Sequence, residues 1–285
     1  MRIILSKEDI KGKKVPITGE KARYLISVLR CKKGDSLQVL DGEGNSYSSK
    51  IIKIENKEVI IEISEKLQYN TESPLNLILV QGILKGEKMD WVIQKITELG
   101  VKEIIPAITE RSQVRHTRKI ERWRKIAEEA SRQSGRTIIP TVHEPVEFKD
   151  FFSKQACINY PPQSPLTKGG IKGGGFIFYE DGGMSLKEAI HKIRIYDTGY
   201  TIQDKENRAF CIGHHASSSG NYFESQPQNF ELMVAVGTEG GFTREEINFA
   251  EEKGLFVISL GKRILRAETA AITAVALIQF LIGDL

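Results

Sequence analysis

Two glycine-containing loops near the C-terminus contain the residues that could do chemistry. The first reads Gly-Thr-Glu-Gly-Gly-Phe over 237–242, the second reads Gly-Lys-Arg-Ile-Leu-Arg over 261–266, and each follows a short apolar run. Glycine allows a backbone to approach a ligand closely, and Glu239, Arg266 and Glu268 add charges beside it. A carboxylate in such a place can accept a proton, and a guanidinium can stabilise a developing negative charge.

The segments around these loops predict strands and helices that position them. We expect strands over 232–236 and 256–260, so that each loop lies at the carboxyl end of a strand. A capping box, Thr243 with Glu246 three residues later, begins a short helix that Gly254 ends. Ligands of α/β proteins bind at the carboxyl ends of strands, so the two loops mark the expected site.

A closing helix is predicted over 268–282, and it is apolar on nearly every face. We therefore expect it to be buried on all sides. At about 15 residues it is too short to span a membrane. Arg266 and Glu268 flank its beginning, where charges are costly unless they have partners or a function.

The same alternation of strands and helices extends back to residue 74. Strands are expected over 75–82 and 101–108, and amphipathic helices over 87–99 and 118–133. This pattern predicts the fold class α/β, with a mostly parallel sheet between layers of helices.

Residues 2 to about 70 predict a small β-rich domain with one helix over 20–30. Its strands are expected over 2–5, 15–18, 36–40, 45–54 and 58–64. The helix is rich in Lys and Arg, which fits an RNA-binding surface and an ordinary solvated helix equally well. The polar, turn-prone stretch 69–74 is the expected boundary, which gives domains over 1–70 and 74–285.

Composition and charge are those of an ordinary soluble protein. Apolar residues make up 40% of the chain and charged residues 27%, and no apolar run is long enough for a membrane span or a secretory signal. The three cysteines are far apart, which fits a reducing cytoplasm. Residues 85–136 hold 13 Lys and Arg against 8 Asp and Glu, which is compatible with a polyanionic partner or with a solvated face.

Several motifs do not carry a function. The glycines of 169–175 lack the Gly-Lys-Ser/Thr that opens a phosphate-binding helix, so we interpret them as linker. Cys211, His214 and His215 lack a fourth ligand at suitable spacing, and no metal site is expected.

The segment of about 160–228 is loose in pattern. Within it we expect only a brief strand over 176–179 and a helix over 185–193, and an exposed loop of low order over 197–228.

Two motifs resemble the paired signatures of the RsmE-type methyltransferases: Gly-Thr-Glu-Gly-Gly-Phe-Thr-x-x-Glu over 237–246 and Leu-Gly-x-Arg-Ile-Leu-Arg-x-Glu-Thr-Ala over 260–270. Gly-Glu-Lys-Met over 86–89, Gln-Ser-Gly-Arg over 133–136 and Val-Leu-Arg over 28–30 match in order and spacing. The resemblance covers nearly the whole chain except about 160–228. Enzymes of this family methylate N3 of a uridine in small-subunit (16S) ribosomal RNA.

The resemblance implies a PUA-like β-barrel over 1–70 and a SPOUT-type α/β domain over 74–285 whose C-terminus forms a trefoil knot. It also implies a homodimer packed partly through the closing helix, and S-adenosylmethionine held in the knot loops. This sequence departs from the family at Thr238 and Lys262, where proline is usual. Neither change removes a charged group, so we expect an intact cofactor site with softer loops.

The family's site is carried over to matching positions as a hypothesis. Arg266 is expected to stabilise the uracil anion, and Glu239 or Glu268 to take the N3 proton. Cofactor contacts are expected from Val236, Gly237, Gly240, Gly241, Leu260, Gly261, Ile264, Leu265 and Thr269. Phosphate contacts are expected from Arg23, Arg30, Lys85, Lys88, Arg111, Arg115, Arg132 and Arg136.

The expected partner is small-subunit ribosomal RNA or the 30S particle, with no membrane and no metal. Two alternatives stay open: a SPOUT methyltransferase acting on another RNA position or on a ribose 2′-oxygen, and a ribosome-associated RNA-binding protein without catalysis.

Overall fold

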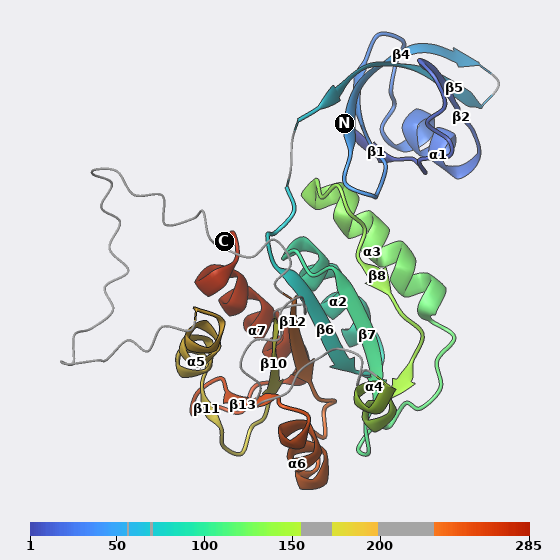
Figure 1. The fold of residues 1–285 in the computed structure, drawn as a ribbon. Helices are drawn as coiled ribbons and strands as arrows, with labels where there is room; N and C mark the ends of the chain where they lie inside the picture. Colours follow the sequence, from blue (N-terminus) through green and yellow to red (C-terminus); the bar gives the residue numbers. More distant parts are fainter. Residues whose placement is uncertain (56, 69–70, 155–172, 199–230) are drawn as a thin grey trace, which may run out of the picture.

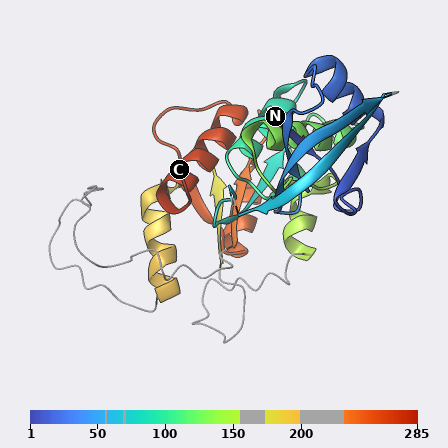
Figure 2. The ribbon, with the colours of Figure 1, turned by 90° about the horizontal axis from the view of Figure 1, so that it is seen from above.

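Two sheets with flanking helices make up the part of the chain that the structure describes (Figure 1). The computed structural model describes residues 1–55, 57–68, 71–154, 173–198 and 231–285. The first sheet belongs to the N-terminal domain and the second to the α/β domain, and Figure 2 shows the same arrangement from above.

The N-terminal domain is a five-stranded sheet with the order β1-β3-β4-β5-β2. Its elements are β1 (Arg2–Ile4), β2 (Lys14–Ile17), α1 (Gly19–Arg23), β3 (Ser36–Leu40), β4 (Ser46–Glu55) and β5 (Glu58–Leu67). Alternate apolar side chains, among them Val15, Val39 and Ile61, point into one core because successive strand residues face opposite sides. The helix predicted over 20–30 is α1 followed by a π-helical turn over Tyr24–Val28.

The α/β domain contains a sheet in which every pairing is parallel, as the sequence predicted. Its strand order is β11-β13-β10-β12-β6-β7-β8, and β9 also pairs with β7. The strands are β6 (Asn76–Gly82), β7 (Glu103–Ile108), β8 (Thr141–Val142), β9 (Val146–Glu147), β10 (Gly173–Phe178), β11 (Met184–Ser185), β12 (Glu231–Val236) and β13 (Phe256–Ser259). The helices are α2 (Lys88–Glu98), α3 (Ile120–Ser134), α4 (Phe148–Lys154), α5 (Leu186–Thr198), α6 (Arg244–Glu252) and α7 (Ala267–Ile282).

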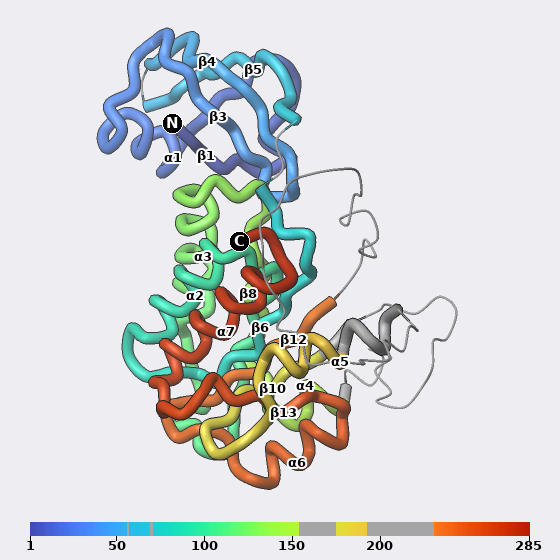
Figure 3. Tube along the Cα trace, turned by 90° about the vertical axis from the view of Figure 1, so that its left-hand side faces the viewer, coloured from blue at the N-terminus to red at the C-terminus, as the bar shows by residue number. Residues whose placement is uncertain are grey.

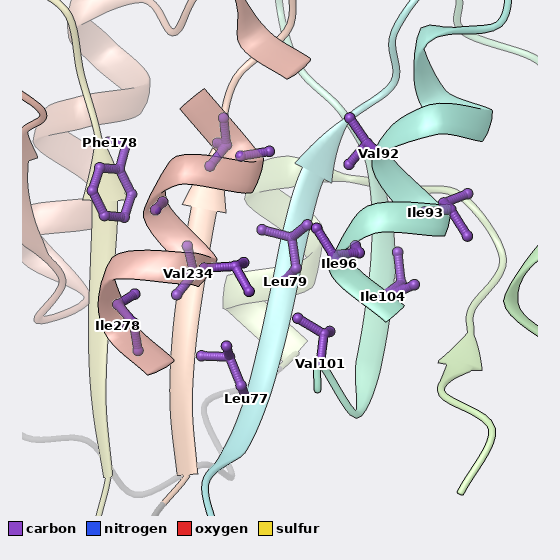
Figure 4. Packing of buried hydrophobic residues seen from close by; sticks show 14 of the residues in the cluster. Leu77, Leu79, Val92, Ile93, Ile96, Val101, Ile104, Phe178, Val234 and Ile278 are labelled. Carbon is purple, nitrogen blue, oxygen red and sulfur yellow. The ribbon is translucent and has the colours of Figure 1, made fainter. Parts of the chain in front are cut away.

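Helices cover both faces of this sheet. Leu77 and Leu79 of β6 face the core under α2, α3, α5 and α7, whereas Ile78 and Val80 face α4 and α6. Figure 4 shows the first of these cores, with Val92 and Ile96 of α2 and Ile278 of α7 around the strands. Burial on both faces explains why these strands are continuous apolar runs without polar alternation.

Part of the segment expected to be loose is regular structure. β10 lies inside the sheet between β12 and β13, and it begins at Gly173, within the glycines that we interpreted as linker. Gly175 packs against Leu255, whose Cγ would lie 2.9 Å from an added Cβ, so this glycine serves close packing. Of the predicted loop over 197–228, residues 197 and 198 lie in α5. The rest of that loop, with Cys211, His214 and His215, lies outside the described residues, and the trefoil knot stays a prediction.

The expectation that the closing helix is buried on all sides is wrong for the single chain. Leu277 of α7 is 39% exposed and Phe280 is 57% exposed. α7 packs on the sheet and lies beside α2 (Figure 3), and its two exposed apolar residues form one stripe. In the part of the chain that the structure describes, no helix is long and apolar enough to cross a membrane.

The N-terminal domain lies against the end of α3. Arg2 donates a hydrogen bond of 3.2 Å from Nη1 to the carbonyl of Gln133, and Lys21 Nζ lies 3.9 Å from Glu128 Oε1. The Arg132 guanidinium stacks 4.3 Å from the centre of the Tyr24 ring and donates to its hydroxyl. These contacts place the basic helix region of the first domain beside the second.

Candidate active site

A pocket of about 320 Å³ opens at the carboxyl ends of β10, β12 and β13. These strands lie side by side and run parallel, so their exit loops meet at one edge of the sheet. Both loops that the sequence singled out line this pocket, together with the end of β10 and the beginning of α7.

The backbone of loop 237–242 lies close to the end of β6. A Cβ added to Gly82 would lie 2.6 Å from the nitrogen of Thr238 and 2.7 Å from the carbonyl carbon of Gly237. Gln81 is fully buried behind the loop, and its Nε2 donates to the carbonyls of Gly82 and Gly237 at 3.0 and 3.1 Å. Only glycine at position 82 allows the loop to approach the strand so closely.

The capping box that follows the loop is present as predicted. Thr243 Oγ1 accepts from the nitrogen of Glu246 at 3.2 Å, and Glu246 Oε2 accepts from the nitrogen of Thr243 at 2.9 Å. Glu246 is buried, and its Oε1 also accepts from the nitrogen of Glu110 at 2.9 Å. The cap therefore ties the beginning of α6 to the exit of β7 and fixes the end of the glycine loop.

Lys88 lies between the two carboxylates that the sequence offered as bases. Its Nζ donates to Glu239 Oε1 at 3.0 Å and lies 4.0 Å from Glu268 Oε2. Burial raises the pKa of Glu239, but hydrogen bonds from Lys88 and from the backbone nitrogen of Lys85 outweigh it, so this pKa is lowered. Glu239 is thus an ionised carboxylate whose hydrogen bonds already connect its loop to Lys85 and to Lys88 of α2.

Glu268 has a different environment. It is 8% exposed, and its Oε2 is buried without a hydrogen-bond partner in the described part of the chain. It lies on the first turn of α7, where the unpaired backbone N–H groups of the helix favour a negative charge. Of the two candidate bases, Glu239 therefore accepts hydrogen bonds from Lys85 and Lys88, whereas Oε2 of Glu268 accepts none from the described residues.

The second loop contributes cations. Arg266 caps α7 with its backbone, and its carbonyl accepts from the nitrogen of Ala270 at 2.8 Å. Its side chain lines the pocket and forms no hydrogen bond or ion pair among the residues described, and the same holds for Arg263. Gly261 has φ +111, a backbone conformation that favours glycine, so the turn before these arginines depends on it.

Most of the predicted site lies around this one pocket. The predicted residues that line it are Glu239, Arg266, Glu268, Val236, Gly237, Gly241, Leu260, Gly261, Ile264 and Leu265. Gly240 and Thr269 are not in its lining; Gly240 instead accepts a hydrogen bond of 2.8 Å from Arg111.

The sequence reasoning missed several lining residues. Phe178, Tyr179 and Glu180 line the pocket from the end of β10, and Arg263 lines it from the second loop. Lys88 was expected on phosphate but lies beside the carboxylates. Ligands of α/β proteins bind at the carboxyl ends of strands, and this rule predicted the two loops. It would also have predicted the end of β10 if that strand had been assigned to the sheet.

The residues expected to contact phosphate differ in how exposed their side chains are. Arg23, Arg30 and Lys85 are exposed, and Arg115 is exposed beside Glu147 at 3.8 Å. Arg132 is largely covered by Tyr24 and Glu129.

The expectation for Arg136 is wrong. Its side chain is 3% exposed, and its donors are used by Glu72 and by the carbonyls of Thr97 and Val101. A guanidinium buried in this way holds the domain boundary together and is not accessible to RNA.

Family comparisons agree with this geometry. Residues 71–162 and 182–279 match the RNA methyltransferase domain, and residues 17–64 match the RNA methyltransferase PUA domain. The chain belongs to the RNA methyltransferase family. Its fold is accordingly a SPOUT-type α/β domain preceded by a PUA-like domain. The match over 182–228 lies in the segment that the sequence resemblance did not cover. The boundary between 1–70 and 74–285 stays our proposal.

Members of the RNA methyltransferase family resemble this chain over nearly its whole length. Ribosomal RNA small subunit methyltransferase E of Buchnera aphidicola is 29% identical, over 96% of this chain and 97% of the relative. The protein of that name from Bacillus subtilis is 26% identical, over 98% of this chain and 94% of the relative.

Solved structures of the family have the same fold. The crystal structure of ribosomal RNA small subunit methyltransferase E from Neisseria gonorrhoeae, bound to S-adenosyl methionine, is 27% identical with a TM-score of 0.75, and the match covers 99% of this chain and 98% of that one. The putative methyltransferase from Legionella pneumophila, in complex with the same cofactor, is 29% identical with a TM-score of 0.74, over 100% of this chain and 98% of that one.

Proposed function

We propose that this protein transfers a methyl group from S-adenosylmethionine to N3 of a uridine in small-subunit ribosomal RNA. One observation supports this most strongly: in a member of the RNA methyltransferase family, an arginine without an ion pair among the described residues and a buried glutamate line one pocket between two glycine loops. The relatives named above carry the corresponding ribosomal RNA activity in their names. A cytoplasmic location is part of the same proposal.

The pocket fits the cofactor in size and chemistry. Small-molecule sites are typically about 300–1,000 Å³ and mostly apolar with a few polar groups, and here Phe178, Leu260 and Leu265 supply the apolar surface. Two buried polar atoms at its wall, Thr238 Oγ1 and Glu268 Oε2, have no hydrogen-bond partner within the described residues. Unsatisfied polar groups at a pocket wall support binding of a polar ligand.

When bound, S-adenosylmethionine supplies an electrophilic methyl group on a positively charged sulfur. The chain's own task is then to place the uracil and to remove its proton. N3 lies on the pairing edge of the base, so the target nucleotide must be unpaired or flipped into the site. Negative charge spreads to the flanking carbonyl oxygens as the proton leaves, and the guanidinium of Arg266, which lines the pocket, can stabilise it.

We assign the role of base to Glu268. Glu239 already accepts from Lys88 and from the backbone nitrogen of Lys85, and those donors favour its ionised form. Glu268 is buried, and its Oε2 accepts no hydrogen bond from the described residues and faces only Lys88 Nζ at 4.0 Å, which leaves this oxygen available to take a proton. Lys88 faces both carboxylates, so it holds Glu239 in place and lies beside Glu268.

RNA phosphates contact exposed cations on both domains. Arg111 donates to the carbonyl of Gly240 in the first loop, and Arg115 is exposed four residues later. Arg23 and Arg30 are exposed on the N-terminal domain. Such contacts neutralise phosphates and position the strand without reading its sequence. Affinity for RNA is therefore expected to fall steeply as salt rises.

A homodimer covers the exposed apolar stripe of α7. Leu277 and Phe280 are one turn apart on one side of this helix, and Trp91 of the adjacent helix α2 is 47% exposed. Light scattering should report about twice the chain mass of 32.0 kDa, and Phe280→Asp should report a monomer. Val28→Asp, at an exposed apolar residue of the other domain, is the matched control and should leave the dimer intact.

The decisive experiment incubates the protein with labelled S-adenosylmethionine and small-subunit RNA or 30S particles, followed by nucleoside digestion. N3-methyluridine supports the proposal. Label on another base or on a ribose 2′-oxygen would replace it with a different RNA methyltransferase activity. Absence of both transfer and cofactor binding would favour a non-catalytic RNA-binding protein.

Single variants separate the assigned roles. Arg266→Ala should abolish turnover and leave cofactor affinity nearly unchanged. Glu268→Gln should lower kcat by about 100-fold or more, as expected for loss of a general base. Glu239→Gln is the matched control and should act mainly on cofactor affinity by loosening its loop. Retained turnover in Arg266→Ala or Glu268→Gln would remove the role given to that residue.

A further inference from the structure

The end of β10 brings a carboxylate into the pocket that neither the mechanism nor the sequence motifs use. β10 lies between β12 and β13, and the nitrogen of Tyr179 continues the ladder by donating to the carbonyl of Ile258 at 3.0 Å. Glu180 follows immediately, so its side chain leaves the sheet edge between the two cofactor loops.

Glu180 packs directly on the backbone of Gly241. A Cβ added at Gly241 would lie 3.0 Å from both the Cδ and the Oε2 of Glu180, and closer still to its Oε1. Gly241 also has φ +69, so two independent constraints favour glycine at this position. Loop 237–242 therefore has room for the Glu180 carboxylate only because residue 241 is glycine.

Within the described part of the chain, this carboxylate has no partner of its own. Glu180 forms no ion pair or hydrogen bond with any described residue, whereas Lys88 in the same pocket is engaged by Glu239 and Glu268. The two oxygens of the Glu180 carboxylate lie against the first loop. Together they can accept hydrogen bonds from two neighbouring hydroxyl groups.

We propose that the Glu180 carboxylate accepts hydrogen bonds from the ribose hydroxyls of the bound S-adenosyl cofactor. In doubly wound sheets, a glycine loop follows one strand and an acidic residue at the end of a neighbouring strand binds the ribose of the nucleotide. β12 with loop 237–242 and β10 with Glu180 have that same relation. This inference rests on the proposed function, because it concerns the same cofactor.

The test is calorimetric and needs no RNA. S-Adenosylhomocysteine, its 2′-deoxy and 3′-deoxy forms, and 5′-methylthioadenosine are titrated into the full chain and into Glu180→Gln. The variant should bind S-adenosylhomocysteine and 5′-methylthioadenosine about 10- to 100-fold more weakly, the loss expected for hydrogen bonds to a charged acceptor. At least one deoxy form should bind the two proteins with affinities that differ by less than about threefold.

Asp181→Asn is the matched control, since Asp181 is the next acidic residue of the same turn and does not line the pocket. It should bind every ligand as the unaltered chain does. Thermal unfolding at an unchanged midpoint shows that Glu180→Gln remains folded.

Three results would overturn the inference. An equal loss for the ribose and both deoxy ligands would show that the hydroxyls are not the contact. A loss for S-adenosylhomocysteine but none for 5′-methylthioadenosine would place the carboxylate on the amino-acid end of the cofactor. If the unaltered chain fails to bind S-adenosylmethionine, the cofactor part of the proposed function fails first, and this inference fails with it.

Discussion

Loss of one member of the buried ion pair between Glu72 and Arg136 should strongly destabilise the α/β domain. The two side chains are 6% and 3% exposed, and Arg136 donates to Glu72 Oε2 from Nε at 3.1 Å and from Nη2 at 2.7 Å. Its Nη1 donates to the carbonyls of Thr97 and Val101 at 2.9 and 2.7 Å. One guanidinium thus ties the domain linker to the end of α2 and to the segment before β7.

Arg136→Met removes this cation and keeps a side chain of similar length. The Glu72 carboxylate then stays buried without the cation beside its Oε2, and the carbonyls of Thr97 and Val101 lose a partner. Removing one member of a buried pair typically costs about 3–5 kcal/mol. With a urea dependence of about 2–3 kcal/mol per molar, the unfolding midpoint should fall by roughly 1–2 M.

Tryptophan fluorescence in urea is a suitable assay, because Trp91 and Trp123 are the two tryptophans of the chain and both lie in the α/β domain. Lys21→Met is the matched control: it removes a cation from the half-exposed pair with Glu128, and it should change stability by at most about 1 kcal/mol. If Arg136→Met and Lys21→Met shift the midpoint equally little, the reasoning from burial is refuted.

Three further predictions concern the loops of the pocket. Gly82→Ala should displace the first loop and weaken cofactor binding, since its Cβ would meet backbone atoms of that loop; calorimetry showing unchanged affinity would contradict this. Thr243→Ala should lower the free energy of unfolding by about 1 kcal/mol through loss of the cap, as measured in urea. The lowered pKa of Glu239 adds stability above its ordinary value of 4.5, and that stability is lost as the pH falls through the lowered pKa. Lys88→Met should therefore lower the free energy of unfolding at pH 7. In acid, the free energies of unfolding of the variant and the unaltered chain should become more similar. Urea titrations at pH 7 and in acid would measure both.

Local patterns in the sequence predicted most of the α/β domain correctly. Strands such as β6 and β12 are short apolar runs bounded by turns, and α2 and α3 have clear helical periodicity. The capping box at Thr243 was predictable because it depends on residues three apart. Short elements such as β8, β9 and α4 were missed because so few residues carry too little periodicity.

Partners that are distant in the sequence could not be predicted. Arg136 carries the same charge as Arg115, and only the fold decides that one is buried on Glu72 and the other exposed. Lys88 looked like a phosphate contact because nothing in its neighbourhood indicates that Glu239, about 150 residues later, comes to lie 3.0 Å from it.

The sequence by itself determined the α/β class, the two glycine loops and the charged residues on them, because glycine, capping and apolar patterns act within a few residues. Tertiary structure alone decided that β10 enters the sheet between β12 and β13, and so that Glu180 joins the pocket. It also decided that α7 keeps one apolar stripe exposed. Parallel strands are joined by long crossover connections, so their order does not follow from neighbouring residues. The order is selected by the burial of both faces of the sheet, which depends on the whole domain and cannot be predicted from a short segment.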